Sequence, residues 1–139
     1  EEAYMTDQEL VKLAFTMLER AYAPYSGFPV GAALLCADGT VFTGCNVENA
    51  AYGSTLCAER TALVKAVSEG HRHDWVRLAV AGRSEDHCWP CGACRQMLYE
   101  FCPGLEVLAA RGDGDFVSAP LRQLLPRGFG PKHLKREAP

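Results

Sequence analysis

The chain has 139 residues, of which 48% are hydrophobic and 22% charged, with a formal net charge of −3. The length suits a single domain over residues 1–139, and the composition is ordinary for a folded globular protein, which excludes a disordered one. Because the chain is weakly acidic, starts with acidic residues, and has neither a basic cluster nor an apolar run of about 18 residues, we expect a cytoplasmic protein that acts on a small molecule and has no nucleic acid or membrane partner.

The first predicted element is an amphipathic helix over residues 7–22. Thr6 and Glu9 have the spacing of a capping box, and apolar residues then recur at helical intervals until a proline ends the pattern. Two apolar segments, 30–36 and 40–45, follow on either side of an Asp-Gly pair, which is a strong hairpin signal. We therefore expect two antiparallel strands after the first helix.

Helices and strands alternate in the rest of the chain. Helices are predicted over residues 57–68, 91–101 and 120–125. Strands are predicted over residues 75–81, 105–109 and 116–118. Ser54 or Thr55 is the expected N-cap of the first of these helices. Residues 131–139 are charged, and we expect them to form a loosely held tail.

This order of elements predicts an α/β fold. A mixed sheet of five strands would lie between helical layers, with the antiparallel hairpin first and parallel strands after it. Parallel pairing would gather the helix N-termini at one end of the sheet.

Two cysteines open the predicted helix 91–101. Cys91 and Cys94 are three residues apart, so their side chains lie on one face of the helix, close enough to hold one ion. The unpaired N–H groups and the dipole at a helix start stabilise thiolates there. A CxxC pair alone leaves metal binding and redox chemistry open.

A third cysteine, Cys57, opens the predicted helix 57–68, and Glu59 follows two residues later. Three thiol ligands on zinc leave a fourth position for water, whose pKa zinc lowers to about 7. Glu59 alone would simply complement the helix dipole, but beside such a water it is a natural proton carrier. Because residues i and i+2 face apart on a helix, Cys57 must lie at or before the first helical residue for both side chains to approach one ion.

The charge of this predicted site needs compensation. Zinc with three thiolates is net negative, which would make bound water less acidic than at a site of neutral imidazoles. Arg60, three residues after Cys57, is expected to donate to the thiolate sulfurs. The alternative for Arg60 is a solvated arginine on a helix surface.

Cys88 offers a different arrangement of the metal site. Cys88 and Cys91 form a second CxxC, and all four cysteines would make a closed tetrahedral structural site. We favour Cys91 and Cys94 because a proline leaves Cys88 in the loop before the helix. The four histidines are not at metal-ligand spacing from the cysteines and are expected at the surface: His71, His73, His87 and His133.

Five blocks of sequence, in order, resemble one family over nearly the whole chain. The blocks span residues 25–33, 44–50, 57–62, 90–96 and 124–126. Cys-x-Glu followed by Pro-Cys-x-x-Cys is a signature of zinc deaminases. The chain resembles the small, homotetrameric cytidine deaminases. That resemblance implies a three-layer α/β/α sandwich and the hydrolytic deamination of cytidine and 2′-deoxycytidine to the uridines, with release of ammonia in pyrimidine salvage.

The resemblance also implies roles for individual residues. Cys57, Cys91 and Cys94 match the ligands of one zinc ion per subunit. Glu59 matches the residue that shuttles protons during the reaction, and Arg60 matches the residue hydrogen-bonded to the thiolates.

Substrate contacts are implied in the same way. Asn46 and Glu48 match the family's contacts to the ribose hydroxyls, a role that suits a carboxylate because it accepts strongly from hydroxyl groups. Phe28 matches an aromatic beside the base, and the backbone at Ala58 a contact to the pyrimidine edge. Without the resemblance, these would be a loop aromatic over the core and polar turn residues.

Two further aromatic residues would reach the active site of a neighbouring subunit. Tyr52 and Phe129 match positions that reach a neighbouring subunit's site, so a homotetramer would complete the pocket. Trp89 stands where many relatives have a small residue, and Cys88 is additional. These two departures leave the pocket's dimensions and the redox sensitivity of the metal site open, not the reaction type.

Two rival functions differ from this expectation. A deaminase of a cytosine-nucleoside antibiotic of the blasticidin type shares the zinc motif, but the carboxylate of Glu48 fits a free ribose better. A non-catalytic zinc-stabilised binding module would use the four cysteines; it would have no activity for Glu59 to support, and chelation would unfold it. A polynucleotide-editing deaminase would need a basic groove, which the acidic balance argues against.

Overall fold

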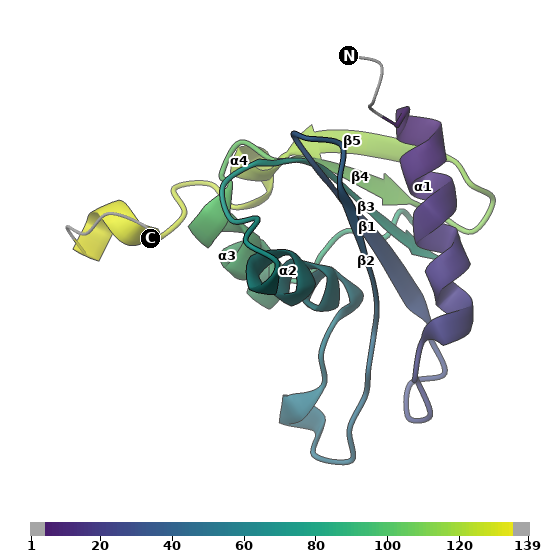
Figure 1. Ribbon diagram of the computed structural model, residues 1–139. Helices are drawn as coiled ribbons and strands as arrows, with labels where there is room; N and C mark the ends of the chain where they lie inside the picture. Colours follow the sequence, from purple (N-terminus) through teal and green to yellow (C-terminus); the bar gives the residue numbers. More distant parts are fainter. Residues whose placement is uncertain (1–4, 135–139) are drawn as a thin grey trace.

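The computed structural model describes residues 5–134, and a five-stranded sheet forms its centre (Figure 1). The strands are β1 (Val30–Cys36), β2 (Val41–Cys45), β3 (Trp75–Gly82), β4 (Glu106–Ala110) and β5 (Phe116–Pro120). They lie side by side in the order β2-β1-β3-β4-β5. β1 pairs antiparallel with both β2 and β3, β3 pairs parallel with β4, and β4 pairs antiparallel with β5.

Parallel pairing is more limited than the sequence suggests. The prediction of a mixed five-stranded sheet that begins with a hairpin is confirmed, but only β3 and β4 run parallel. β5 returns antiparallel to β4 after residues 111–115. A parallel connection needs a crossover of a dozen or more residues, and this turn is too short for one.

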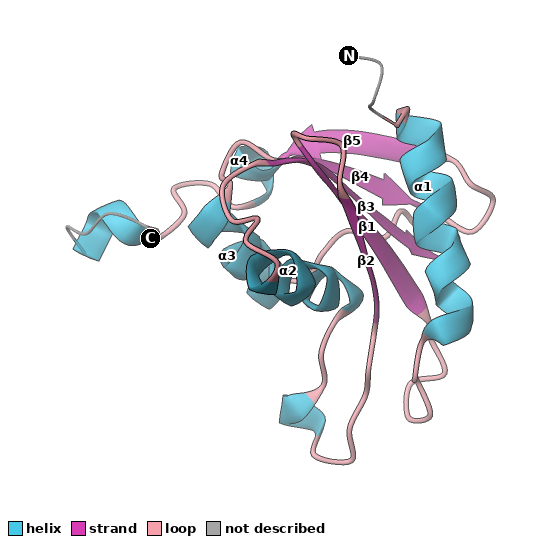
Figure 2. Cartoon of the chain, in the orientation of Figure 1, coloured by secondary structure: helices cyan, strands magenta, loops and turns pink. Residues whose placement is uncertain are grey.

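Helices cover both faces of the sheet, giving three layers (Figure 2). α1 (Asp7–Thr16) packs on one face, while α2 (Ala58–Ser68) and α3 (Gly92–Phe101) pack on the other. The short helical elements are η1 (Met17–Arg20), η2 (Tyr52–Ser54), α4 (Leu121–Leu124) and η3 (Pro131–Leu134). The expected α/β/α sandwich is confirmed.

Alternation along the strands builds two separate hydrophobic cores. In β1, Ala32 and Leu34 pack with the core under α2 and α3, whereas Ala33 and Leu35 pack with the core under α1. Since helices cover both faces, β1 is buried from its second residue to its last instead of on alternate residues only. The α2 and α3 layer therefore has a core of its own that holds these helices on the sheet.

The first helix is shorter than the predicted segment 7–22. α1 ends at Thr16, and the chain continues as the 3-10 turn η1. The Thr16 hydroxyl donates to the carbonyl of Leu13 over 2.6 Å, a local bond that competes with the helical pattern. The predicted capping box is present: Glu9 N donates to Thr6 Oγ1, and Thr6 N donates to Glu9 Oε1.

The start of α2 also differs from the prediction. Its N-cap is Cys57 in an extended conformation, and Ser54 and Thr55 instead end and follow the turn η2. The backbones of Leu56 and Val47 exchange two hydrogen bonds of 2.9 Å, which keeps residue 56 extended. The helix consequently begins directly after Cys57.

The end of the described chain is a short 3-10 helix. Residues 131–134 of the predicted tail form η3, and residues 135–139 of that tail lie outside the described residues. Within residues 5–134, each helix falls short of the length and apolar character needed to cross a bilayer.

Candidate active site

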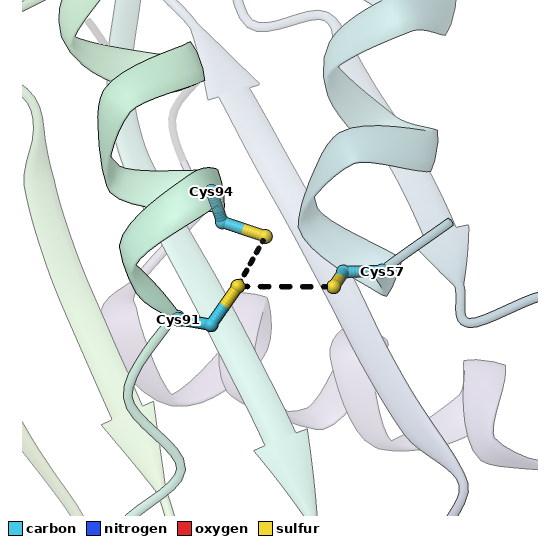
Figure 3. Close-up of side chains that lie close together, drawn as sticks. All are labelled: Cys57, Cys91 and Cys94. Atoms are coloured by element: carbon cyan, nitrogen blue, oxygen red, sulfur yellow. Dashed lines mark hydrogen bonds between the residues drawn. The ribbon is translucent and has the colours of Figure 1, made fainter. Parts of the chain in front are cut away.

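The N-termini of α2 and α3 bring three cysteines together (Figure 3). Cys57 and Cys91 are the N-cap residues of the two helices, and Cys94 lies in the first turn of α3. The Sγ atoms of Cys57 and Cys91 are 4.0 Å apart, those of Cys91 and Cys94 are 3.6 Å apart, and all three lie within 4.8 Å of one another. Cys57 thus occupies the N-cap position that the sequence argument requires.

The spacing of these sulfurs fits a zinc ion. Tetrahedral zinc with Zn–S bonds of about 2.3 Å separates two sulfurs by about 3.8 Å. The two measured separations, 3.6 and 4.0 Å, lie on either side of that value. Neither N-cap cysteine uses its side chain to cap its helix, so both thiols are available as ligands.

Positive charge faces this thiol cluster. Arg60 Nη2 lies 3.3 Å from Cys57 Sγ and 3.4 Å from the carbonyl oxygen of Thr55. The pKa of Cys57 is lowered mainly by its contact with Cys94 and secondly by the Arg60 guanidinium. The contact with Cys57 in turn raises the pKa of Cys94. The two thiols therefore titrate as a pair that shares negative charge.

Glu59 is the carboxylate beside the cluster. It lies in the first turn of α2, only 5% of its surface is exposed, and burial raises its pKa to about 7. A buried carboxyl group with such a pKa exchanges its proton readily near neutral pH, which suits a general acid and base. Burial with no salt bridge to another described residue is unusual for a glutamate that only complements a helix dipole.

Two of the three thiols, Cys57 and Cys91, and Glu59 open onto one pocket of about 310 Å³, which we call the thiol pocket. Its volume lies at the lower end of the range of about 300–1,000 Å³ for small-molecule sites. The pocket is lined by Ser26, Phe28, Val30, Asn46, Thr55, Cys57, Ala58, Glu59, Cys88, Trp89 and Cys91. Potential metal ligands, a proton carrier and an aromatic wall therefore share one small cavity.

Comparison with known proteins agrees with this geometry. Residues 5–109 match the family model described as the cytidine and deoxycytidylate deaminase zinc-binding region. The chain belongs to this deaminase family. It is 47% identical to a cytidine deaminase of Sporosarcina psychrophila, over 96% of this chain and 98% of the relative. It is 50% identical to a cytidine deaminase of Halalkalibacterium halodurans, over 90% of this chain and 95% of the relative.

A solved structure of the same family has the same fold. The crystal structure of cytidine deaminase from Burkholderia pseudomallei superposes with a TM-score of 0.87 at 48% sequence identity. The match covers 90% of this chain and all of that one. The arrangement of layers and strands is thus that of the cytidine deaminases.

Three of the residues expected to contact substrate in this deaminase lie in the thiol pocket. The Phe28 ring packs over Gly82 at the end of β3, where a Cβ atom would lie 3.0 Å from it. Asn46 is buried, and its amide holds the backbone of residues 28–30: Nδ2 donates to the Phe28 carbonyl, and Oδ1 accepts from Val30 N. Ala58 also lines the pocket, between Cys57 and Glu59. Contact of these residues with substrate stays a prediction.

Glu48 and Tyr52 lie in an adjoining hollow of about 380 Å³, which shares Ser26 and Thr55 with the thiol pocket. Glu48 Oε1 accepts from the backbone N–H groups of Tyr25 and Ser26, and the Ser26 hydroxyl donates to Oε2. The hydrogen bond from the Ser26 hydroxyl is the main cause of the lowered pKa of Glu48. The carboxylate therefore positions the 25–26 loop, and its contact with a ribose stays a prediction.

Phe129 lies outside both cavities of its own chain. More than half of its surface is exposed, and its ring stacks on His133 with centroids 5.3 Å apart. Gln96 Nε2 donates to its carbonyl oxygen over 2.8 Å, which fixes the backbone at this point. The sequence prediction assigns Phe129 to a neighbouring subunit's site, and that assignment stays a prediction.

Cys88 does not join the thiol cluster among the described residues. Its thiol lines the pocket, and burial followed by the nearby Glu59 raises its pKa to about 11. The four-cysteine arrangement considered from the sequence is therefore not assembled here. Trp89 also lines the pocket, so both departures from the family pattern shape the cavity.

Sequence reasoning missed two polar pocket residues and the pairing of two histidines. Ser26 and Thr55 line the pocket, but a serine in a turn and a threonine near a helix start carry no specific signal. His71 and His87 are expected at the surface, yet their side chains are only 21% and 24% exposed. Each pairs with an aspartate, at 2.7 and 2.9 Å respectively, and such pairs are hard to infer without the fold.

Proposed function

We propose that the chain catalyses the zinc-dependent hydrolytic deamination of cytidine and 2′-deoxycytidine to uridine and 2′-deoxyuridine. The observation that supports this most directly is the convergence of Cys57, Cys91 and Cys94 at a pocket that Cys57, Cys91 and the buried carboxyl group of Glu59 line. Cytidine deaminases that align over nearly the whole chain make the same substrate class the natural choice.

The three thiols would hold one zinc ion, with Arg60 neutralising part of their charge through its contact with Cys57. When bound, zinc lowers the pKa of water and so supplies a hydroxide nucleophile near neutral pH. Three thiol ligands would leave one coordination position open, as in catalytic zinc sites.

Glu59 would move the protons. Its carboxylate takes the proton that water loses and passes it to N3 of the cytosine ring. It then takes the proton of the hydroxyl group formed at C4 and delivers it to the leaving amine. The reaction adds oxygen at C4, breaks the bond from C4 to the exocyclic nitrogen and releases ammonia. Burial of Glu59 excludes bulk water, which would otherwise compete for these proton transfers.

Recognition of the nucleoside would be divided between the two adjoining cavities. Phe28 and the backbone of Ala58 would contact the base in the thiol pocket, which Asn46 also lines, while Glu48 lies in the second cavity. Asn46 and Glu48 would exchange hydrogen bonds with the ribose hydroxyls. A substrate that fills both cavities is larger than a free base.

We also propose a homotetramer in the cytoplasm. Tyr52 and Phe129 are 73% and 54% exposed, and large aromatics exposed beside a site fit burial against a neighbouring subunit. All seven cysteines are free, as in proteins of a reducing compartment. Light scattering coupled to size-exclusion chromatography would measure the assembly directly.

The decisive experiment is Glu59→Gln, assayed on cytidine, deoxycytidine, cytosine and CMP with zinc quantified in the same samples. The wild-type chain should deaminate the two nucleosides only. Glu59→Gln should keep its zinc and its fold, because the amide has nearly the shape of the carboxyl group, but should lose nearly all turnover. Wild-type rates in the variant would overturn the mechanism, and a wild-type response to CMP or cytosine would overturn the substrate class.

A further inference from the structure

A second group of metal-ligating side chains lies at the other end of α2. Cys36 is the last residue of β1, and His71 and Asp74 lie in the loop between α2 and β3. One ligand atom of each residue lies within 4.8 Å of the other two. With a helical rise of about 1.5 Å per residue, the 11 residues of α2 separate this Cys36 cluster from Cys57 by about 16 Å.

The Cys36 cluster has an excess of acidic groups. Asp74 Oδ2 lies 2.7 Å from His71 Nδ1, and Asp38 Oδ2 lies 3.9 Å from His71 Nε2. Burial, and then the charges of Asp74 and Asp38, raise the pKa of Cys36 to about 12. Arg60 contacts the Cys57 thiol, but between residues 5 and 134 the structure describes no arginine or lysine in contact with the Cys36 thiol.

One atom of the cluster has no partner. Asp74 Oδ1 is buried and makes no hydrogen bond with the described residues. Buried carboxylate oxygens are normally satisfied, so each exception needs an explanation such as an ion or a bound water. This oxygen lies on the residue that already contacts the imidazole, and a cation would satisfy it.

We propose that Cys36, His71 and Asp74 form a structural binding site for zinc or another thiophilic divalent cation. Thiolate, imidazole and carboxylate are the three ligand types of protein zinc sites. Binding forms bonds to one atom of each residue, and the proton of the Cys36 thiol passes to solvent. Asp38, at the turn between β1 and β2, is a further carboxylate beside His71.

Backbone contacts hold the ligands of this site in place. Ala37 N donates to the Asp74 carbonyl over 2.7 Å, which joins the β1–β2 turn to the α2–β3 loop next to Cys36. Trp75 Nε1 donates to the His71 carbonyl over 3.0 Å, which fixes the loop from the other side. A cation at the Cys36 cluster would therefore link two segments that already meet, and would stabilise the folded chain by mass action.

The test is the zinc content of the intact chain after equilibrium dialysis against zinc chloride, read as the difference between variants. Wild type should bind one equivalent more than His71→Ala and one equivalent more than Asp74→Asn. The amide of Asp74→Asn keeps the shape of the loop, so this variant serves as the test if His71→Ala folds poorly. His87→Ala is the matched control, since His87 also pairs with an aspartate but belongs to neither group of three metal-ligating side chains among the described residues, and it should bind as much zinc as wild type.

Thermal unfolding supplies a second measurement. Added zinc should raise the midpoint more in wild type and His87→Ala than in Asp74→Asn, because only the first two retain the site. Equal zinc content in wild type and Asp74→Asn would overturn the proposal, as would a loss of one equivalent in His87→Ala. These differences do not involve Cys57, Cys91 or Cys94, so failure of this site and failure of the proposed deaminase activity are distinguishable.

Discussion

The two faces of the sheet are both covered by helices, but the helix starts on the two faces differ. On the α1 face, the Thr6 and Glu9 side chains satisfy the first backbone N–H groups of the helix. On the other face, α2 and α3 start at Cys57 and Cys91 without a side-chain cap. A helix start without a cap forgoes about 0.5–2 kcal/mol of stability. Its free N–H groups and dipole can instead stabilise negative charge placed next to the helix start.

That difference assigns separate roles to the two layers. The core under α1 is built from aliphatic residues such as Leu10, Val11 and Leu108, and α1 contributes no residue to the thiol pocket. The core under α2 and α3 fixes the positions of two uncapped helix starts, which is where the thiols and Glu59 lie. Changes on the first face should affect stability alone, and changes on the second should affect stability and chemistry together.

The largest effect is expected from removing a thiol at a helix start. Cys94→Ala should abolish zinc binding at the cluster and all measurable deamination, because two thiols leave the ion incompletely held. Cys88→Ala is the matched control, since Cys88 lies in the same pocket but outside the group of thiols within 4.8 Å. Metal analysis and a cytidine assay would measure both; loss of zinc in Cys88→Ala would instead support a four-cysteine site.

Two glycines allow the faces to be compared directly. A Cβ atom at Gly31 would lie 2.0 Å from the Ala14 carbonyl oxygen of α1, and one at Gly44 would lie 2.3 Å from the Ala58 carbonyl oxygen of α2. Each alanine substitution forces its helix away from the sheet, and overpacking of this kind costs about 1–3 kcal/mol.

The two alanine variants should differ in function despite similar losses of stability. Gly44→Ala displaces Ala58, which lies between Cys57 and Glu59, so zinc content and kcat/KM per folded chain should fall. Gly31→Ala displaces α1 only, and both quantities should stay at wild-type values in the folded fraction. Urea unfolding, zinc analysis and kinetics would measure this, and full activity per folded Gly44→Ala chain would contradict the division of roles.

Local patterns explain what could be predicted from the sequence. The thiol cluster follows from helix starts, because an N-cap cysteine and a cysteine three residues later necessarily share one end of a helix. The five strands follow from apolar runs and turn residues, and β1 is predicted to the residue. These features depend on neighbours within a few positions along the chain.

Long-range contacts explain the rest. The N-cap of α2 is set by the bridge between Leu56 and Val47, which no local pattern reveals. Glu48 is engaged by the loop at Ser26, 22 residues earlier, so its folded role in positioning that loop is not visible in the sequence. The partly buried pair of His71 and Asp74 becomes a candidate site only once the fold places Cys36 beside it.

The smallest effect is expected from the cap on the α1 face. Thr6→Ala removes the acceptor for Glu9 N, while Thr6 N can still donate to the Glu9 side chain. Loss of an N-cap threonine should lower the free energy of unfolding by about 1 kcal/mol, which urea denaturation would resolve. Zinc content and kcat/KM should not change, because α1 lies across the sheet from the pocket. A change in kcat/KM would show that the α1 layer is coupled to the chemistry through the strands, and that the two faces do not act separately.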